Sequence, residues 1–129
     1  MDAEILVVDD EPMLADTLAI IFQRAGYTAT AVYSGEEALA LITARQPALV
    51  VTDVVMPGMD GVALAKTVRT SYPTCRVLLF SGNADTQGLL EAAQQDGHTF
   101  EILAKPIGPP QMLAKVESLL NQNSASAVR

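Results

Sequence analysis

Five residues with charged or reactive side chains each follow a short apolar run: Asp9, Asp10, Asp53, Ser81 and Lys105. Short apolar runs of this kind indicate buried strands. In open α/β sheets, ligands bind beyond the carboxyl ends of the strands, where these five residues would lie. Three carboxylates at about 4 Å from one another repel by about 4 kcal/mol per pair, at an effective dielectric constant near 20. Raised pKa values or a bound cation must relieve that repulsion, and Mg²⁺ is the natural candidate because it prefers oxygen ligands.

A cation and a lysine around a carboxylate are suited to phosphoryl transfer onto that carboxylate. The ion neutralises phosphoryl oxygens, Lys105 pairs with another, and the Ser81 hydroxyl can donate a hydrogen bond. Asp53 would be the nucleophile, and the product would be an acyl phosphate.

The elements that must position these residues alternate regularly along the chain. Strands are expected at residues 4–8, 28–33, 48–52, 75–80 and 100–104, and helices are expected to begin near residues 12, 34, 60, 85 and 109. This alternation predicts a doubly wound α/β fold, in which a parallel sheet lies between two layers of helices. The flavodoxin-like strand order 2-1-3-4-5 of a (βα)5 sandwich is expected. In that order strands 1, 3, 4 and 5 are neighbours, so their polar ends converge on one crevice.

Composition limits the other possibilities. The 129 residues favour one domain over residues 1–121, followed by a polar tail over residues 122–129 that is expected to be disordered. A formal net charge of −7 argues against direct nucleic-acid binding by this domain. The apolar runs are far shorter than the ~18 residues of a membrane span, and no basic signal-peptide region opens the chain. A cytoplasmic location is therefore expected, and the single cysteine, Cys75, fits a reducing compartment.

Four motifs, in order along the chain, resemble those of the response-regulator receiver domain of two-component signalling. They are the segments at residues 7–12, 51–61 and 79–82, and the pair Lys105-Pro106. An Asp-Asp or Lys-Pro pair alone carries no information, but the four motifs together, each at a strand end, are specific.

The resemblance implies a role for each matching residue. Asp53 is similar to the phosphoacceptor, and Asp10 to a direct Mg²⁺ ligand. Asp9 is expected to support the ion through water, and the backbone carbonyl of Val55 resembles the third protein ligand.

The remaining matches concern the phosphoryl group and its readout. Ser81 resembles the hydroxyl residue that moves to contact the phosphoryl group, and Lys105 resembles the lysine that pairs with it. The resemblance implies that a histidine kinase or phosphotransfer protein phosphorylates Asp53. The face formed by the fourth helix, fifth strand and fifth helix would then engage a downstream protein, an output domain or a second copy. Such a domain is a switch with slow self-phosphorylation and self-dephosphorylation, rather than an enzyme.

One departure from the family falls on the expected output route. Receivers usually carry an aromatic residue three positions before the lysine, where this chain has Ile102. Phe100 lies two residues earlier, and we hypothesise that it or a shifted loop substitutes for the missing ring.

Two other functions remain as alternatives. An Mg²⁺-dependent phosphohydrolase of the haloacid-dehalogenase kind would need a general acid two residues after the nucleophile, where this chain has Val55. A degenerate receiver would act only as an interaction module. The sequence also leaves open whether the domain is a stand-alone protein or the first part of a longer regulator.

Overall fold

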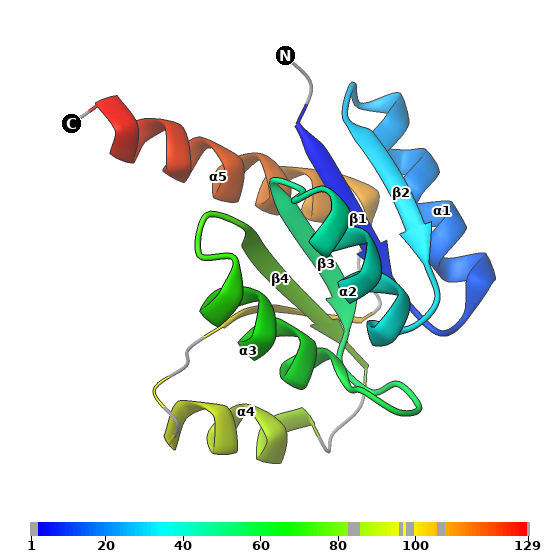
Figure 1. Ribbon diagram of the computed structural model, residues 1–129. Helices are drawn as coiled ribbons and strands as arrows, with labels where there is room; N and C mark the ends of the chain where they lie inside the picture. The colour runs from blue at the N-terminus through cyan, green and yellow to red at the C-terminus, as the bar shows by residue number, and fades with distance from the viewer. Residues whose placement is uncertain (1–2, 83–85, 96, 98–99, 106–107, 129) are drawn as a thin grey trace.

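Five parallel strands and five helices alternate in the computed structural model, which describes residues 3–82, 86–95, 97, 100–105 and 108–128 (Figure 1). The strands are β1 (Glu4–Val8), β2 (Thr28–Val32), β3 (Leu49–Asp53), β4 (Arg76–Ser81) and β5 (Glu101–Ala104). The helices are α1 (Pro12–Arg24), α2 (Gly35–Ala44), α3 (Gly61–Ser71), α4 (Thr86–Gln95) and α5 (Pro109–Val128). The sheet order β2-β1-β3-β4-β5 confirms the prediction.

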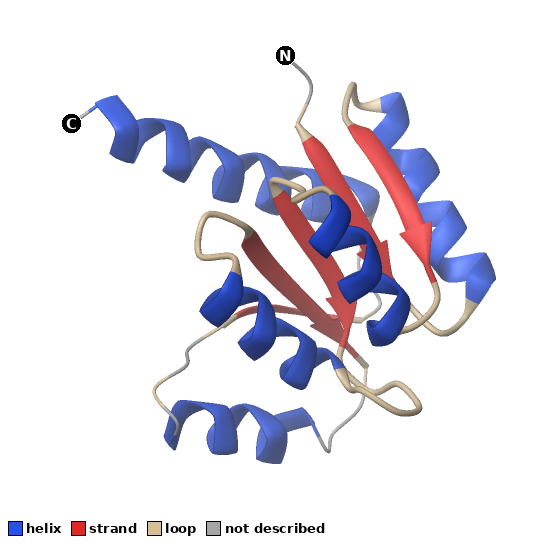
Figure 2. Ribbon diagram, viewed as in Figure 1, coloured by secondary structure: helices blue, strands red, loops and turns tan. Residues whose placement is uncertain are grey.

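The sheet lies between two helical layers, and each layer has its own apolar core (Figure 2). On one face, α1 and α5 pack against the sheet, with Phe22 and Met112 among the buried residues. On the other face, α2 and α3 pack against it, with Ile42 and Leu64 fully buried. Because both faces are covered, the central strands are continuous apolar runs instead of alternating ones. α4 contacts α3 and lies beside it in Figure 1.

Local signals explain where the helices begin. Pro12 occupies the first turn of α1, a position where its missing N–H costs nothing. The Ser34 hydroxyl caps α2 by accepting a hydrogen bond from the Glu37 N–H at 3.1 Å. The Asp60 carboxylate caps α3 in the same way, through the Ala63 N–H at 2.8 Å.

Some boundaries differ from the expected ones. β3 and β4 each begin and end one residue later, so that Asp53 and Ser81 are their final residues. The expected start of the fourth helix at Asp85 lies outside the described residues. α5 continues to Val128, past the expected end of the domain at residue 121, because no glycine or proline follows Pro110 to end the helix. The division into a domain over residues 1–121 and a tail over 122–129 stays a prediction. Within the described ranges, no helix is both long and apolar enough to cross a membrane.

Candidate functional site

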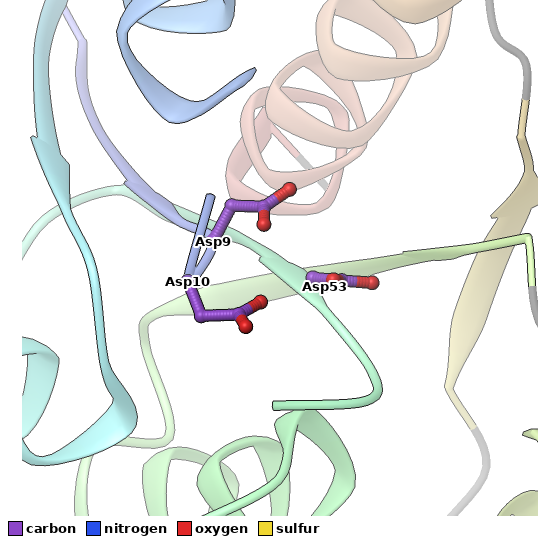
Figure 3. Close-up of side chains that lie close together, drawn as sticks. All are labelled: Asp9, Asp10 and Asp53. Atoms are coloured by element: carbon purple, nitrogen blue, oxygen red, sulfur yellow. The ribbon is translucent and has the colours of Figure 1, made fainter. Parts of the chain in front are cut away.

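Three carboxylates meet at the carboxyl ends of β1 and β3 (Figure 3). β1 and β3 are hydrogen-bonded neighbours, with Val8 opposite Thr52, so the residues that follow them come together. One carboxylate oxygen from each of Asp9, Asp10 and Asp53 lies within 4.8 Å of the other two. Asp9 is fully buried, Asp53 is 9% exposed and Asp10 is exposed. The sheet therefore brings together the acids that the sequence predicts to converge.

Lys105 completes the cluster from the far side of β4. It follows Ala104, which pairs with Ser81 across β4 and β5. Its Nζ lies 3.6 Å from Asp9 Oδ2 and 3.5 Å from Asp53 Oδ1. One ammonium group therefore faces two buried carboxylates, with a third carboxylate next to them. Within the described part of the chain, this site carries more negative than positive charge.

Only some of the carboxylate oxygens of the two buried acids accept hydrogen bonds from the described residues. The Glu11 N–H donates to Asp9 Oδ1 at 3.0 Å, and the Val54 N–H donates to Asp53 Oδ1 at 2.9 Å. Asp9 Oδ2 is buried and has no hydrogen-bond partner among the described residues, although Lys105 lies nearby. A buried carboxylate oxygen without a hydrogen bond is costly. The clustered carboxylate oxygens of the three acids and the Asp9 oxygen without a hydrogen bond suit the binding of a hard divalent cation that keeps some of its water molecules.

Burial raises the pKa of both inner acids above 3.8. For Asp9, burial is opposed by the Glu11 hydrogen bond and by Lys105, both of which lower the pKa. For Asp53, burial is opposed mainly by Lys105, while the neighbouring Asp9 raises the pKa further. The net effect without a metal is that both groups hold protons more tightly than ordinary aspartates. A divalent cation would favour the ionised forms.

These directions predict how stability depends on pH in the absence of metal. Because the folded-state pKa values lie above the unfolded value of 3.8, the folded protein binds more protons than the unfolded chain. The contribution of the two acids is complete below that value and is lost as the pH rises through their folded-state pKa values. The contribution of these two acids to the free energy of unfolding, measured by urea titrations in EDTA, should therefore fall over this range, by at most about 1.4 kcal/mol per pH unit for each group. An Asp53→Asn variant should show a shallower fall. A contribution from Asp53 that increased with pH, judged as the free energy of unfolding of the parent minus that of this variant, would contradict the raised pKa of Asp53.

Ser81 and Gly82 shape the site beside Lys105. Ser81 is buried at the end of β4, and its backbone carbonyl accepts a hydrogen bond from the Lys105 N–H at 2.9 Å. A Cβ added at Gly82 would lie 3.2 Å from the Lys105 Cβ, so a small residue leaves room for the lysine stem. Ser81 is thus buried beside Lys105 at the carboxyl end of the strand next to β3.

Gly61 supports the site, although the sequence indicates only that a helix begins near it. It opens α3, and its N–H donates to the Val54 carbonyl at 2.7 Å. A Cβ built at Gly61 would overlap the backbone carbonyl oxygen of Asp53. α3 therefore begins directly against the strand end that carries Asp53. No local sequence signal identifies this contact, because it depends on where the helix packs.

The loop from Val54 to Asp60 connects Asp53 to α3. Val54 and Met56 are buried, whereas Val55 is 43% exposed. Val55 thus stands two residues after Asp53, at the surface between two buried neighbours.

Ile102 and Phe100 both pack, partly buried, against the core on the α2 and α3 side. Ile102 pairs with Leu79 in the sheet. The Phe100 ring lies 4.2 Å from the guanidinium carbon of Arg69, a cation–π contact. Phe100, just before β5, thus packs on the same face of the sheet as Ile102. Its role as the switch stays a prediction, which a single buried rotamer in both free and phosphorylated structures would contradict.

Comparisons with known proteins find related sequences. The family model "Response regulator receiver domain" matches residues 5–117. NtrC of Salmonella typhimurium, a DNA-binding transcriptional regulator, is 32% identical over 115 residues, which are 89% of this chain and 24% of NtrC. MtrA of Mycolicibacterium smegmatis, a DNA-binding response regulator, is 29% identical over 95% of this chain and 53% of its own length. The chain therefore spans between a quarter and about half of these relatives.

Solved structures show the same fold. NtrX from Brucella abortus superimposes with a TM-score of 0.85 and 29% identity, over 100% of this chain and 30% of NtrX. A CheY-like response regulator receiver domain protein from Methanospirillum hungatei has a TM-score of 0.88 at 22% identity, over 98% of this chain and 99% of that one.

Proposed function

Because this chain belongs to the response regulator receiver domain family, we propose that it accepts a phosphoryl group on Asp53 within a two-component phosphorelay. The observation that carries the proposal is the cluster at the carboxyl end of the sheet. Asp53 lies beside Asp9 and Asp10, and the Lys105 ammonium lies 3.5 Å from its carboxylate. A buried acid surrounded by two further acids and one lysine is suited to phosphoryl transfer and poorly suited to a purely structural role.

Four groups would hold Mg²⁺ in this proposal. Asp10 and the carbonyl of Val55 would bind it directly together with Asp53, and Asp9 would support it through water. When bound, the ion neutralises the phosphoryl oxygens. The site residues fit it because they offer clustered oxygen donors and one buried oxygen without a hydrogen bond.

The chain's own residues then perform the transfer. The ionised Asp53 carboxylate attacks phosphorus, a bond from oxygen to phosphorus forms, and the bond to the donor histidine nitrogen breaks. Lys105 already opposes the rise in the pKa of Asp53 and so favours the ionised nucleophile. Lys105 also pairs with a phosphoryl oxygen, and the Ser81 hydroxyl donates a hydrogen bond to another.

Phosphorylation would shift a two-state equilibrium of the domain. Inward movement of Ser81 alters β4 and its neighbour β5, and the change reaches the face formed by α4, β5 and α5. The chain is therefore proposed to be a cytoplasmic switch that turns its own phosphoryl group over slowly. Its partners would be a histidine kinase or phosphotransfer protein, and a downstream protein, an output domain or a second copy.

An apolar patch beside the acids offers a contact for the donor protein. Met13 is 80% exposed and Leu14 is 39% exposed, both in the first turn of α1 just after the acids. Leu14 also lines a cavity of about 570 Å³ between α1 and α5 that reaches Lys105. A donor helix that covers these side chains would bring its phosphohistidine close to Asp53.

Incubation with acetyl phosphate tests the proposed function. The parent protein is expected to gain one phosphate by mass spectrometry in the presence of Mg²⁺ and none in EDTA. Absence of a Mg²⁺-dependent adduct would overturn phosphoacceptor function and favour a degenerate interaction module. Rapid turnover of many phosphate esters would instead favour the phosphohydrolase, although Val55 stands where that enzyme needs an acid.

A further inference from the structure

The loop after Asp53 has few hydrogen bonds of its own. Its start is fixed, because the Val54 N–H donates to the Phe80 carbonyl and the Val54 carbonyl accepts from Gly61. Over residues 55–59, the described residues provide one hydrogen bond to a backbone N–H: the Met59 N–H donates to Glu36 Oε2 at 3.3 Å. The stretch that contains Val55 is thus held at its far end by a side chain from another element.

Glu36 reaches the loop because two glycines allow a close approach. Gly58 has a φ of +73°, a conformation that glycine adopts without strain, and a Cβ there would lie 3.0 Å from Glu36 Oε2. A Cβ at Gly35 would lie 3.0 Å from the Met59 Cβ. Gly35 and Glu36 at the start of α2 therefore lie against Gly58 and Met59 of the loop.

The first turn of α2 is a firm support for this contact. Ser34 caps the helix, and Ala38 and Ile42 are fully buried in the core beneath it. Glu36 is thus carried by a packed helix, whereas the loop it touches has no regular secondary structure. The contact with Glu36 therefore links the loop to a packed helix.

We propose that Glu36 is a positioning residue that holds the loop after Asp53 in the arrangement needed for metal binding and phosphoryl transfer. The inference rests on the proposed function, because it assigns Glu36 to the same site. Glu36 acts through the backbone of Met59 and not through the metal or the phosphoryl group.

Glu37 is a matched control for Glu36. It is also exposed and lies in the same helical turn, with the same charge. Glu37 Oε1 accepts a hydrogen bond from the Tyr33 N–H at 3.3 Å, the same length as the Glu36 bond. Glu37→Ala therefore removes the same charge and one exposed hydrogen bond as Glu36→Ala, but the lost bond is to Tyr33 and not to the loop.

Two measurements on Glu36→Ala, Glu36→Gln and Glu37→Ala test the proposal. Amide hydrogen exchange by NMR should show the Met59 N–H exchanging about threefold to tenfold faster in Glu36→Ala, the range expected for losing one hydrogen bond. The dissociation constant of Glu36→Ala for Mg²⁺, measured by NMR titration, should rise by a similar factor. Glu36→Gln keeps an acceptor oxygen and should stay within about twofold of the parent in both measurements, as should Glu37→Ala.

The outcomes separate this inference from the proposed function. Unchanged Met59 exchange and Mg²⁺ affinity in Glu36→Ala would overturn the positioning role, while Mg²⁺-dependent phosphorylation of the parent still stood. Equal weakening of Mg²⁺ binding by all three substitutions would also overturn it, because loss of charge would then be sufficient. A parent protein that bound no Mg²⁺ would overturn both proposals.

Discussion

Replacement of Asp53 by asparagine is expected to abolish phosphorylation by acetyl phosphate. An amide cannot act as the carboxylate nucleophile, although it fills nearly the same space at the end of β3. We expect the rate of adduct formation to fall at least about a hundredfold, equivalent to about 2.7 kcal/mol in activation free energy. Mass spectrometry after timed incubation with acetyl phosphate and Mg²⁺ measures the loss.

Asp53→Asn should nevertheless fold normally. Burial and the neighbouring Asp9 both raise the pKa of Asp53, which shows that the charged form is disfavoured at this position without metal. Removing that charge should leave the metal-free protein as stable as the parent or more stable, as judged by thermal unfolding. A loss of phosphorylation can then be attributed to the missing nucleophile.

Asp60→Asn provides the matched control. Asp60 lies at the other end of the same loop, where its carboxylate caps α3 by accepting from the Ala63 N–H. Asparagine is an equally good helix cap, so this variant should retain both stability and phosphorylation. An unchanged phosphate adduct in Asp53→Asn would show that a different residue is the acceptor, and the assignment of Asp53 would be wrong.

Gly61→Ala is expected to cause a large loss of stability. The added methyl group would overlap the backbone carbonyl of Asp53, which is held in place by a hydrogen bond from the Thr52 hydroxyl at 2.9 Å. Overpacking of this kind costs about 1–3 kcal/mol, whereas the gain in helix propensity from glycine to alanine is at most about 1 kcal/mol. The overlap should dominate, and urea unfolding should show a net loss of about 1–2 kcal/mol.

Gly88→Ala separates the packing effect from helix propensity. Gly88 is exposed within α4, and a Cβ there would have no neighbour within 4 Å. The same substitution should therefore stabilise the protein by about 0.5–1 kcal/mol. Gly61→Ala should also be phosphorylated more slowly, because the carbonyl that the added methyl group displaces belongs to Asp53 itself. A Gly61→Ala variant as stable as the parent would contradict the close packing of α3 against β3.

The general arrangement of the site follows from local patterns in the sequence. Asp9 and Asp53 each come at the end of a run of apolar residues that indicates a buried strand, and both lie at carboxyl ends of the parallel sheet. Strand order then places the ends of β1 and β3 next to each other. The acids and their convergence were therefore predictable, since each step depends on short-range periodicity and on general rules of chain topology.

Burial within the cluster was decided by tertiary structure. Asp9 and Asp10 are adjacent and chemically identical, yet Asp9 is fully buried and Asp10 is exposed. Their difference arises because successive side chains leave the strand end in different directions. The absence of a hydrogen bond to Asp9 Oδ2 among the described residues and the distance of this atom from Lys105 follow from that direction. The Asp-Asp pair in the sequence predicts neither of them.

By itself, the sequence determined the strands and the polar residues at their ends, because apolar periodicity and strand-end position are local properties, and general rules of chain topology then predicted the strand order. Only the tertiary structure decided how that site is supported. The fit of Gly61 against the Asp53 carbonyl and the contact of Glu36 with the Met59 N–H join residues whose own sequence context indicates only a turn and a helix start. Such contacts depend on how packed elements approach one another in space, which no local pattern encodes.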